Sequence, residues 1–274
     1  MPLRGSSAPS LAEQVRSAAV ASSGMCGVYA RTYGSGEPLV TYHPDVVFPA
    51  ASTIKLLIFA ALYARAASDL ALLSQKVTIR KSDLVGGSEF VDAAGGRTTF
   101  TVEQLARAMI VVSDNSAGNA LITLLGFDEI NGKAGQLGLD GTHCKRHFMD
   151  FPAVWRHFDN VTTPRDMGTL SYEIERGARD GSSQVAPQEQ CRTMIAVLLK
   201  QEDREKIAAG LPRGTPLANK TGEVTGVRND VGIVDPYGAS PYVLAVLTKN
   251  LDDQAAGVAA IRRIARAVNA AVPD

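Results

Sequence analysis

A serine and a lysine three residues apart stand at the start of an apolar stretch. The stretch reads "FPAASTIKLLIFAALYARA" over residues 48–66, and Lys55 is the only charged residue between Thr53 and Ala64. Because a helix brings residues i and i+3 onto one face, Ser52 and Lys55 would lie one turn apart. An ammonium group that leaves water is normally paired or shifted towards its neutral form, so Lys55 requires an explanation.

This pair has the chemistry of an activated nucleophile. A hydroxyl is a poor nucleophile until its proton is removed, and a desolvated neutral lysine can accept that proton. Ser52 also lies at the start of the predicted helix, where free backbone N–H groups can bind an oxyanion. The alternative is a serine cap with a lysine that reaches solvent, and so short a motif by itself favours that alternative.

Two further motifs follow in the chain. They are Ser113–Asn115 in "VVSDNSAGN", at a break between two predicted helices, and Lys220–Gly222 in "ANKTGEVTGVRND", on a predicted strand. Each read alone is an ordinary capping turn or strand end. Together with Ser-x-x-Lys, and in this order, they form the motif set of class A β-lactamases and penicillin-binding proteins, which favours a functional site.

The sequence therefore resembles the class A β-lactamase family of active-site serine hydrolases. The resemblance extends from the first predicted hairpin to the last predicted strand, and "SDNSAGNALI" and "KTGEVTGVRND" are especially similar to the family pattern. It implies a sheet lobe with a helical lobe, and an acyl-enzyme formed with β-lactam or related amide and ester substrates. It implies no cofactor and no metal.

The resemblance also implies roles for individual residues. Ser52 would be the nucleophile, Lys55 its proton acceptor or orienting partner, and Ser113 the proton relay to the leaving nitrogen. Asn115 would steady the substrate amide and Lys55. The remaining implied groups are Lys220, Thr221, Gly222 and Arg228 for the substrate carboxylate, and the backbone N–H groups of Ser52 and Glu223 for the oxyanion hole. Arg228 could equally be an ordinary surface residue of a strand.

One part of the family pattern is missing. Class A enzymes use a loop glutamate for deacylation, but the region "THCKRHFMDFPAVWRHFDNVTTPRDM" contains no glutamate. Asp150 and Asp159 are its only acids before the next predicted helix, and Asn160 would match the family's loop asparagine. That alignment places Arg156 where the glutamate is expected, and an arginine cannot act as a base. We therefore expect acylation with slow deacylation.

Glu223 is a second departure, since the family usually has a small residue after Lys-Thr-Gly. Its carboxylate could repel anionic substrates or act as a base with a raised pKa. With Lys55, Lys220 and Arg228 facing few acids, the cleft is expected to attract a substrate carboxylate. The cluster from His143 to His147, with His157 nearby, has zinc-ligand residue types but no paired C-x-x-C, which favours loop packing over a metal site.

The order of predicted elements indicates an α/β (α+β) fold. Strands are predicted near both termini, in "CGVYARTYG" with "PLVTYH", and again in "PLANKT", "VRNDVGIV" and "PYVLAVLTKN". Helices are predicted between them, with capping patterns at Thr101 and Thr163. We expect residues 1–49 and 210–274 to form an antiparallel sheet covered by terminal helices, residues 50–209 to form an inserted all-helical lobe, and the active site to lie between them.

Composition excludes several other classes. The 28 basic and 28 acidic residues cancel, so no nucleic-acid partner is expected. No long apolar window is free of polar residues, so no membrane span is expected, and three scattered cysteines do not make a disulfide framework. The expected protein is a monomer that binds a small molecule, cytoplasmic as the sequence stands or exported if a signal was removed.

Three functions remain open on these grounds. The first is a serine hydrolase that turns over its substrate: a weak β-lactamase, or an esterase or amidase on this fold. The second is a D-alanyl-D-alanine peptidase of the penicillin-binding type, whose acyl-enzyme with penicillins is long-lived. The third is a non-catalytic sensor domain that acylates and stays acylated. The physiological substrate and the deacylating base are not specified by the sequence.

Overall fold

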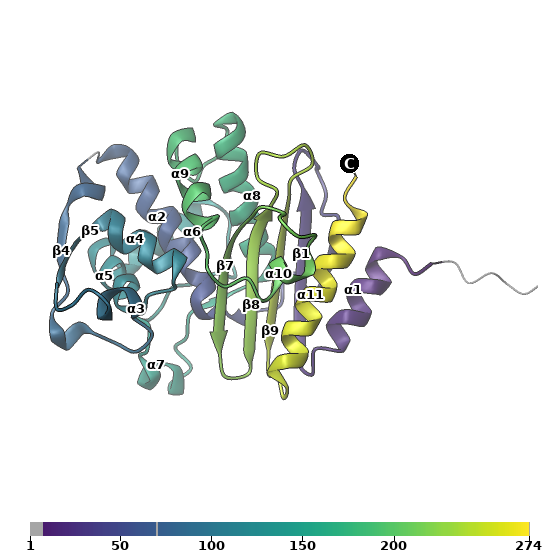
Figure 1. Cartoon of the computed structure of the whole chain (residues 1–274), viewed down its shortest axis with the longest axis horizontal. Coiled ribbons are helices and arrows are strands. Elements are labelled where there is room, and N and C mark those ends of the chain that lie inside the picture. Colours follow the sequence, from purple (N-terminus) through teal and green to yellow (C-terminus); the bar gives the residue numbers. More distant parts are fainter. Residues whose placement is uncertain (1–7, 70, 274) are drawn as a thin grey trace, which may run out of the picture.

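A five-stranded antiparallel sheet joins the two ends of the chain. The computed structural model describes residues 8–69 and 71–273 (Figure 1). The sheet order is β2-β1-β9-β8-β7, with β1 Met25–Thr32, β2 Val40–Tyr42, β7 Leu217–Val224, β8 Val227–Val234 and β9 Tyr242–Lys249. The predicted hairpin is present as the antiparallel pair of β1 and β2. The predicted fold class is confirmed.

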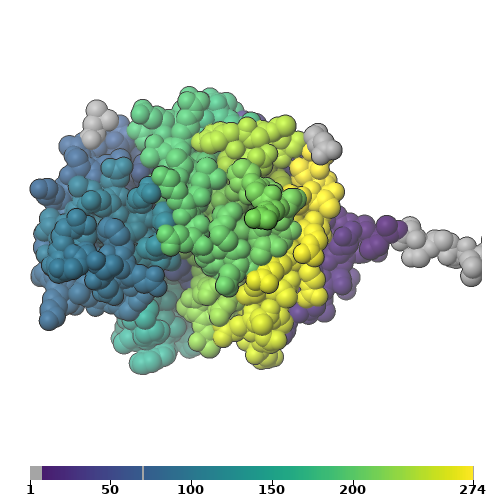
Figure 2. Space-filling view, in the orientation of Figure 1, coloured from purple at the N-terminus to yellow at the C-terminus, as the bar shows by residue number. Residues whose placement is uncertain are grey.

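Helices cover both faces of this sheet. On one face α1 (Leu11–Val20) and α11 (Gln254–Ala271) lie side by side, and they form one end of the molecule in Figures 1 and 2. Their apolar residues bury a core with alternate residues of the strands, since successive strand residues point to opposite faces. On the other face α8 (Pro164–Asp180) packs against β1, β8 and β9.

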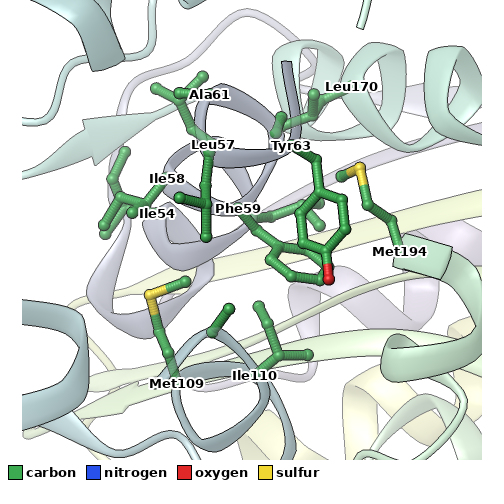
Figure 3. Close-up of a cluster of buried hydrophobic side chains, with 14 of the residues drawn as sticks. Ile54, Leu57, Ile58, Phe59, Ala61, Tyr63, Met109, Ile110, Leu170 and Met194 are labelled. Carbon is green, nitrogen blue, oxygen red and sulfur yellow. The ribbon is translucent and has the colours of Figure 1, made fainter. Parts of the chain in front are cut away.

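The helical lobe is built around α2 (Lys55–Ser68). Ten of its side chains are buried, among them Leu57, Phe59 and Tyr63, which contact neighbouring helices in Figure 3. The other helices of this lobe are α3 Glu89–Asp92, α4 Val102–Val111, α5 Asn115–Leu125, α6 Phe127–Gln136, α7 Phe151–Trp155 and α9 Gln188–Leu198, with the 3-10 turns η1 Ala51–Ile54, η2 Leu72–Ser74 and η3 Lys81–Asp83. The short helix α10 (Ile207–Gly210) packs against α11 and β8. The predicted caps are present: Thr101 begins α4 with a capping box, and Thr163 caps α8.

Two features differ from the predicted division into lobes. The segment 50–209 contains short strands: β4 Lys76–Thr78 pairs with β5 Thr99–Thr101, and β6 Val161–Thr162 pairs with β3 Phe48–Pro49. In addition α8 belongs by its packing to the sheet, because Gly168 lets the helix approach the ring of Tyr29. A boundary drawn by sequence position cannot show this, since it depends on long-range contacts.

One helical stretch, Ala51–Ser68, is long and apolar enough to span a membrane by length and composition alone. It comprises η1 and α2, and 67% of its apolar window is buried inside the protein. The stretch is apolar because it is the central helix of the core, where most of its faces contact other side chains.

Candidate active site

The turn that carries Ser52 is pressed against the edge strand of the sheet. Ser52 lies in η1, and Ala51 before it has a left-handed backbone with φ 47°. On β7, a Cβ atom added to Gly222 would lie 3.0 Å from the Ser52 nitrogen and 2.9 Å from the Thr53 nitrogen. The strand can therefore pass this close only because residue 222 has no side chain.

Lys55 is fully buried and directed at the two serines. Its Nζ lies 3.2 Å from Ser52 Oγ and 3.2 Å from Ser113 Oγ, and it donates to the Ser113 carbonyl at 2.6 Å. It also donates to Asn115 Oδ1 at 2.7 Å. Burial holds the pKa of Lys55 well below its ordinary value, the charge of Lys220 lowers it further, and Asp114 offsets part of this. A lysine in this state can accept a proton from a neighbouring hydroxyl.

Ser113 lies between the two buried lysines. Lys220 Nζ donates to Ser113 Oγ at 3.0 Å, and Lys55 Nζ lies 3.2 Å from the same oxygen. Ser113 has φ 59°, a conformation that a non-glycine residue holds only when its surroundings fix it. Asp114 supplies part of that fixation, because its carboxylate caps α5 at the Ala117 N–H and also accepts from the Val91 N–H. The turn therefore presents the Ser113 hydroxyl in one direction.

Asn115 links Lys55 to another wall of the site. Its Oδ1 accepts from Lys55, and its Nδ2 donates to the Gly86 carbonyl at 2.8 Å. Its backbone N–H donates to the Gly87 carbonyl at 2.9 Å. The segment before α3 is thus held against the start of α5.

Lys220 and Thr221 are buried on β7. Besides Ser113, Lys220 Nζ donates to the Thr221 carbonyl at 2.7 Å. Burial lowers the pKa of Lys220 to about 7, partly offset by the charge of Asp230, which lies opposite Thr221 on β8. Burial disfavours the charged form of both neighbouring lysines, which reduces the repulsion between them.

Asn229 positions the nucleophile turn and was not singled out from the sequence. This fully buried residue of β8 donates from Nδ2 to the Pro49 carbonyl at 2.9 Å and to the Ala50 carbonyl at 3.3 Å. Its Oδ1 accepts from the Thr248 N–H of β9. The sequence signal was an asparagine at an inward position of an apolar strand, where a polar group requires partners.

Glu223 and Arg228 lie differently from the sequence expectations. The Glu223 carboxylate is 2.5 Å from Lys206 Nζ and 3.8 Å from Arg228 Nε. The same Lys206 nitrogen is 2.5 Å from the Asp203 carboxylate. Glu223 is thus an ion-pair partner at the cleft edge. Arg228 donates to the carbonyls of Val224 and Val227 in the β7–β8 turn, and it is not among the residues that line the cleft.

The loop that lacks a glutamate is closed by an ion pair between Arg146 and Asp159 at 2.7 Å. Asn160 supports this closure by accepting from the N–H groups of Lys145 and Arg146, so it faces the loop backbone. This packing of Asn160 does not support its predicted match to the family's loop asparagine, and Arg156, at the predicted glutamate position, is exposed.

Phe148 is the residue of this loop that reaches Lys55. The Lys55 nitrogen lies 4.3 Å from the centroid of its ring, and the ring packs against Gly118. Asn119 holds the backbone of Phe148 at both its N–H and its carbonyl. Asp150, one of the two candidate acids, caps α7 at the Ala153 N–H. No carboxylate of this loop hydrogen-bonds to Ser52 or Lys55 in the part of the chain that the structure describes.

The cleft beside Ser52 has a volume of about 400 Å³. Its lining includes Ser113, Asn115 and Thr221, so the three motifs converge on one cavity. It also includes the acidic residues Glu89, Glu202, Asp203 and Glu223. The expectation of a cleft with few acids is therefore wrong, because three of these residues belong to segments that no motif marks.

The histidine and cysteine cluster gives no metal centre within residues 8–69 and 71–273, where no group of three metal-ligating side chains occurs. Cys144 is buried, and burial raises the pKa of its thiol to about 12. A thiol in that state is a packing group rather than a thiolate ligand.

Comparison with known proteins agrees with this geometry. Residues 10–272 match the model of the Beta-lactamase enzyme family. The chain belongs to the β-lactamase enzyme family. The carbapenem-hydrolyzing β-lactamase KPC of Klebsiella oxytoca is 31% identical over 265 residues, covering 88% of this chain and 83% of the relative. The β-lactamase Toho-1 of Escherichia coli is 30% identical over 246 residues, covering 86% and 80%.

Solved structures extend the likeness to the whole fold. The β-lactamase from Sphaerobacter thermophilus superposes with a TM-score of 0.85 at 32% identity, covering 96% of this chain and 98% of that one. The structure of PBP-A superposes with a TM-score of 0.82 at 27% identity, covering 95% of both chains. The protein is thus a β-lactamase-like serine hydrolase of the class A type.

Proposed function

We propose that this enzyme forms an acyl-enzyme on Ser52 with β-lactams or related amides and esters, and that it releases the acyl group slowly. The observation that carries the proposal is the contact of a fully buried Lys55, with its pKa held low, to Ser52 Oγ at 3.2 Å. A hydroxyl beside an amine whose neutral form is favoured by burial, at the N-terminus of a helix, has the arrangement of an activated nucleophile.

In the acylation step, Lys55 accepts the Ser52 proton as Oγ attacks the substrate carbonyl. The developing oxyanion accepts from the N–H groups of Ser52 and Glu223, which the close packing of β7 on η1 supports. Ser113 Oγ then passes a proton to the leaving nitrogen and regains one from the lysines that contact it. The carbonyl carbon–nitrogen bond breaks and the Ser52 ester remains.

Substrate binding is assigned to the groups that frame the cleft. Asn115 holds Lys55 and offers its amide to the substrate, while Lys220, Thr221 and Gly222 form the strand along which the substrate lies. A substrate carboxylate would meet the Thr221 and Ser113 hydroxyls beside Lys220. Arg228 has no part in this proposal, because its guanidinium donates to backbone carbonyls.

The proposed slow deacylation rests on Phe148. Hydrolysis of the ester needs a water molecule and a base to activate it. On the loop side, the neighbour of Lys55 is an aromatic ring, and the loop acids Asp150 and Asp159 are occupied as a helix cap and an ion-pair partner. This favours a penicillin-binding type of enzyme, the second of the predicted functions. Among structural neighbours, a point mutant of PBP-A is described as an acyl-enzyme complex with penicillin G.

Intact-mass spectrometry after mixing with benzylpenicillin tests the proposal. A mass increase equal to the whole penicillin, mapped to the peptide of Ser52 and absent in Ser52→Ala, is expected, and the adduct should persist long after excess penicillin is removed. Labelling retained in Ser52→Ala would refute the assignment of the nucleophile. A short-lived adduct with released penicilloate would contradict slow deacylation and indicate a working β-lactamase.

A further inference from the structure

The cleft beside Ser52 is lined by acidic residues and by no basic residue. Its charged lining consists of Glu89, Glu202, Asp203 and Glu223, and the rest is serine, threonine, amide, valine and glycine. A cleft lined by one sign of charge raises the local concentration of ligands that carry the opposite sign.

Two of these carboxylates share one ammonium, and the other two are exposed. Asp203 and Glu223 share the ammonium of Lys206, which is 1% exposed and 2.5 Å from each. Across residues 8–69 and 71–273, no ion pair involves Glu89 or Glu202, and both are exposed. Their charges therefore act on whatever enters the cleft.

The buried lysines of the site do not cancel this charge. Lys55 and Lys220 are both fully buried behind the cleft surface, with their ammonium hydrogens directed at Ser113, Asn115 and backbone carbonyls. Burial also lowers the pKa of both lysines, that of Lys220 to about 7, which disfavours their charged forms.

The two free carboxylates lie in segments that the catalytic residues hold in place. Glu89 begins α3, directly after the segment whose Gly86 and Gly87 carbonyls accept from Asn115. Glu202 follows α9, and its N–H donates to the Val111 carbonyl, two residues before Ser113. Both positions are thus tied to the same pair of helices, α4 and α5, that presents the catalytic turn.

We propose that this cleft selects acyl donors that carry a cationic group, such as a primary ammonium, and that Glu89 and Glu202 determine this preference. The inference rests on the proposed function, since Ser52 defines the site and the carboxylates determine only which substrates enter it. A substrate with a carboxylate on its acyl side chain would be disfavoured by the same charges.

Three penicillins that differ in one substituent provide the test. Ampicillin, benzylpenicillin and carbenicillin carry an ammonium, a hydrogen and a carboxylate on the same side-chain carbon. Equilibrium binding to the Ser52→Ala variant, measured by calorimetry at low ionic strength, isolates recognition from acylation. We expect affinity to fall about threefold to tenfold at each step from ampicillin to benzylpenicillin to carbenicillin. Acylation of the wild-type Ser52 should follow the same order.

Matched variants test whether the preference comes from these two carboxylates rather than from the charge of the whole protein. Adding Glu89→Gln and Glu202→Gln should reduce the difference between ampicillin and carbenicillin to about twofold, and salt at about 0.5 M should do the same. Glu37→Gln, an exposed glutamate in the turn between β1 and β2, should leave the difference unchanged.

The outcomes distinguish this inference from the function on which it rests. Equal binding of the three penicillins, or tightest binding of carbenicillin, would overturn the cationic preference even if Ser52 is acylated normally. The expected order in binding, without any adduct on wild-type Ser52, would support the preference and sink the acyl-enzyme proposal. Absence of measurable binding by all three would overturn the preference as well.

Discussion

The ring of Phe148 lies over the ammonium of Lys55, with 4.3 Å between the nitrogen and the ring centroid. The same nitrogen is 3.2 Å from the oxygen of Ser52. The loop residue nearest the activating lysine is therefore a hydrocarbon group, which can exclude water but cannot accept a proton. This contact supports the proposal that the enzyme acylates readily and hydrolyses the ester slowly.

Replacing Phe148 by glutamate should therefore speed deacylation. The backbone of residue 148 is held by Asn119, so a carboxylate would be presented beside Lys55 and the ester on Ser52. Positioned general bases typically contribute about a hundredfold or more, and we expect the benzylpenicillin adduct of Phe148→Glu to decay faster by that order. Adduct lifetime is measured by intact mass after removal of free penicillin.

Phe148→Gln is the matched control, because it opens the same space without adding a base. Equal lifetimes of the glutamate and glutamine variants would show that water access limits deacylation. A lifetime unchanged from wild type in both variants would show that Phe148 has no part in the slow step.

Gly222→Ala should impair acylation and stability together. The added Cβ would lie 2.9 to 3.0 Å from the backbone atoms Thr53 N, Ser52 N and Ala50 O, none of which can rotate away. The strand and η1 must then separate, which misplaces the oxyanion donors. We expect a loss of about tenfold or more in acylation rate and a lower melting temperature.

Gly132→Ala, on the exposed face of α6, is the control for Gly222→Ala, because it replaces a glycine away from the active site. No atom lies near its added Cβ, so it should stabilise the fold by about 0.5–1 kcal/mol and leave acylation unchanged. Wild-type acylation in Gly222→Ala would contradict the proposed place of the oxyanion hole.

The free energy of unfolding should rise with pH above neutrality. Lys220 has a pKa of about 7 in the folded protein against an ordinary value of 10.5, so between these values the unfolded chain binds more protons. One such group adds up to about 1.4 kcal/mol per pH unit across this window. The pKa of Asp230 is raised to about 6, so between pH 3.8 and 6 the folded chain binds more protons and the free energy of unfolding falls with pH. This range lies below the range in which Lys220 titrates, and the lowered pKa of Lys55 changes stability in the same direction as that of Lys220.

Urea unfolding at pH values of about 7, 8 and 9 measures this slope. Lys220→Met should reduce it, because the variant no longer titrates at residue 220, whereas Lys200→Met, on an exposed lysine, should leave it unchanged. Equal slopes in wild type and Lys220→Met would mean that Lys220 is charged in the folded protein at neutral pH.

The parts of the fold that follow local rules could be predicted from the sequence. Capping residues such as Thr101 and Thr163 mark helix starts wherever they occur, and alternating apolar residues mark the strands at both termini. The antiparallel hairpin of β1 and β2 follows from the turn between them. These features depend on neighbours within a few positions along the chain, and the structure has them where they were expected.

The lobe boundary and the conformation of the loop that contains Phe148 could not be predicted from local patterns. The packing of α8 on the sheet and the contact of Phe148 with Lys55 join positions far apart in the chain. Alignment by motif spacing placed Arg156 in the glutamate position, because the closure of the loop by Arg146 and Asp159 is not visible in a local pattern.

For the site, the sequence by itself determined the reacting groups: a serine and a lysine one helical turn apart, with Ser113 and Lys220 in motifs that follow. Residue type and spacing suffice for that, since they fix which hydroxyl can meet which amine. Only the tertiary structure decided the electrostatics of the cleft. Lys206 neutralises Glu223, Arg228 turns to the backbone, and Glu89 and Glu202 reach the cavity. Charge and burial depend on every segment that surrounds a site, and those segments are brought together only by the fold.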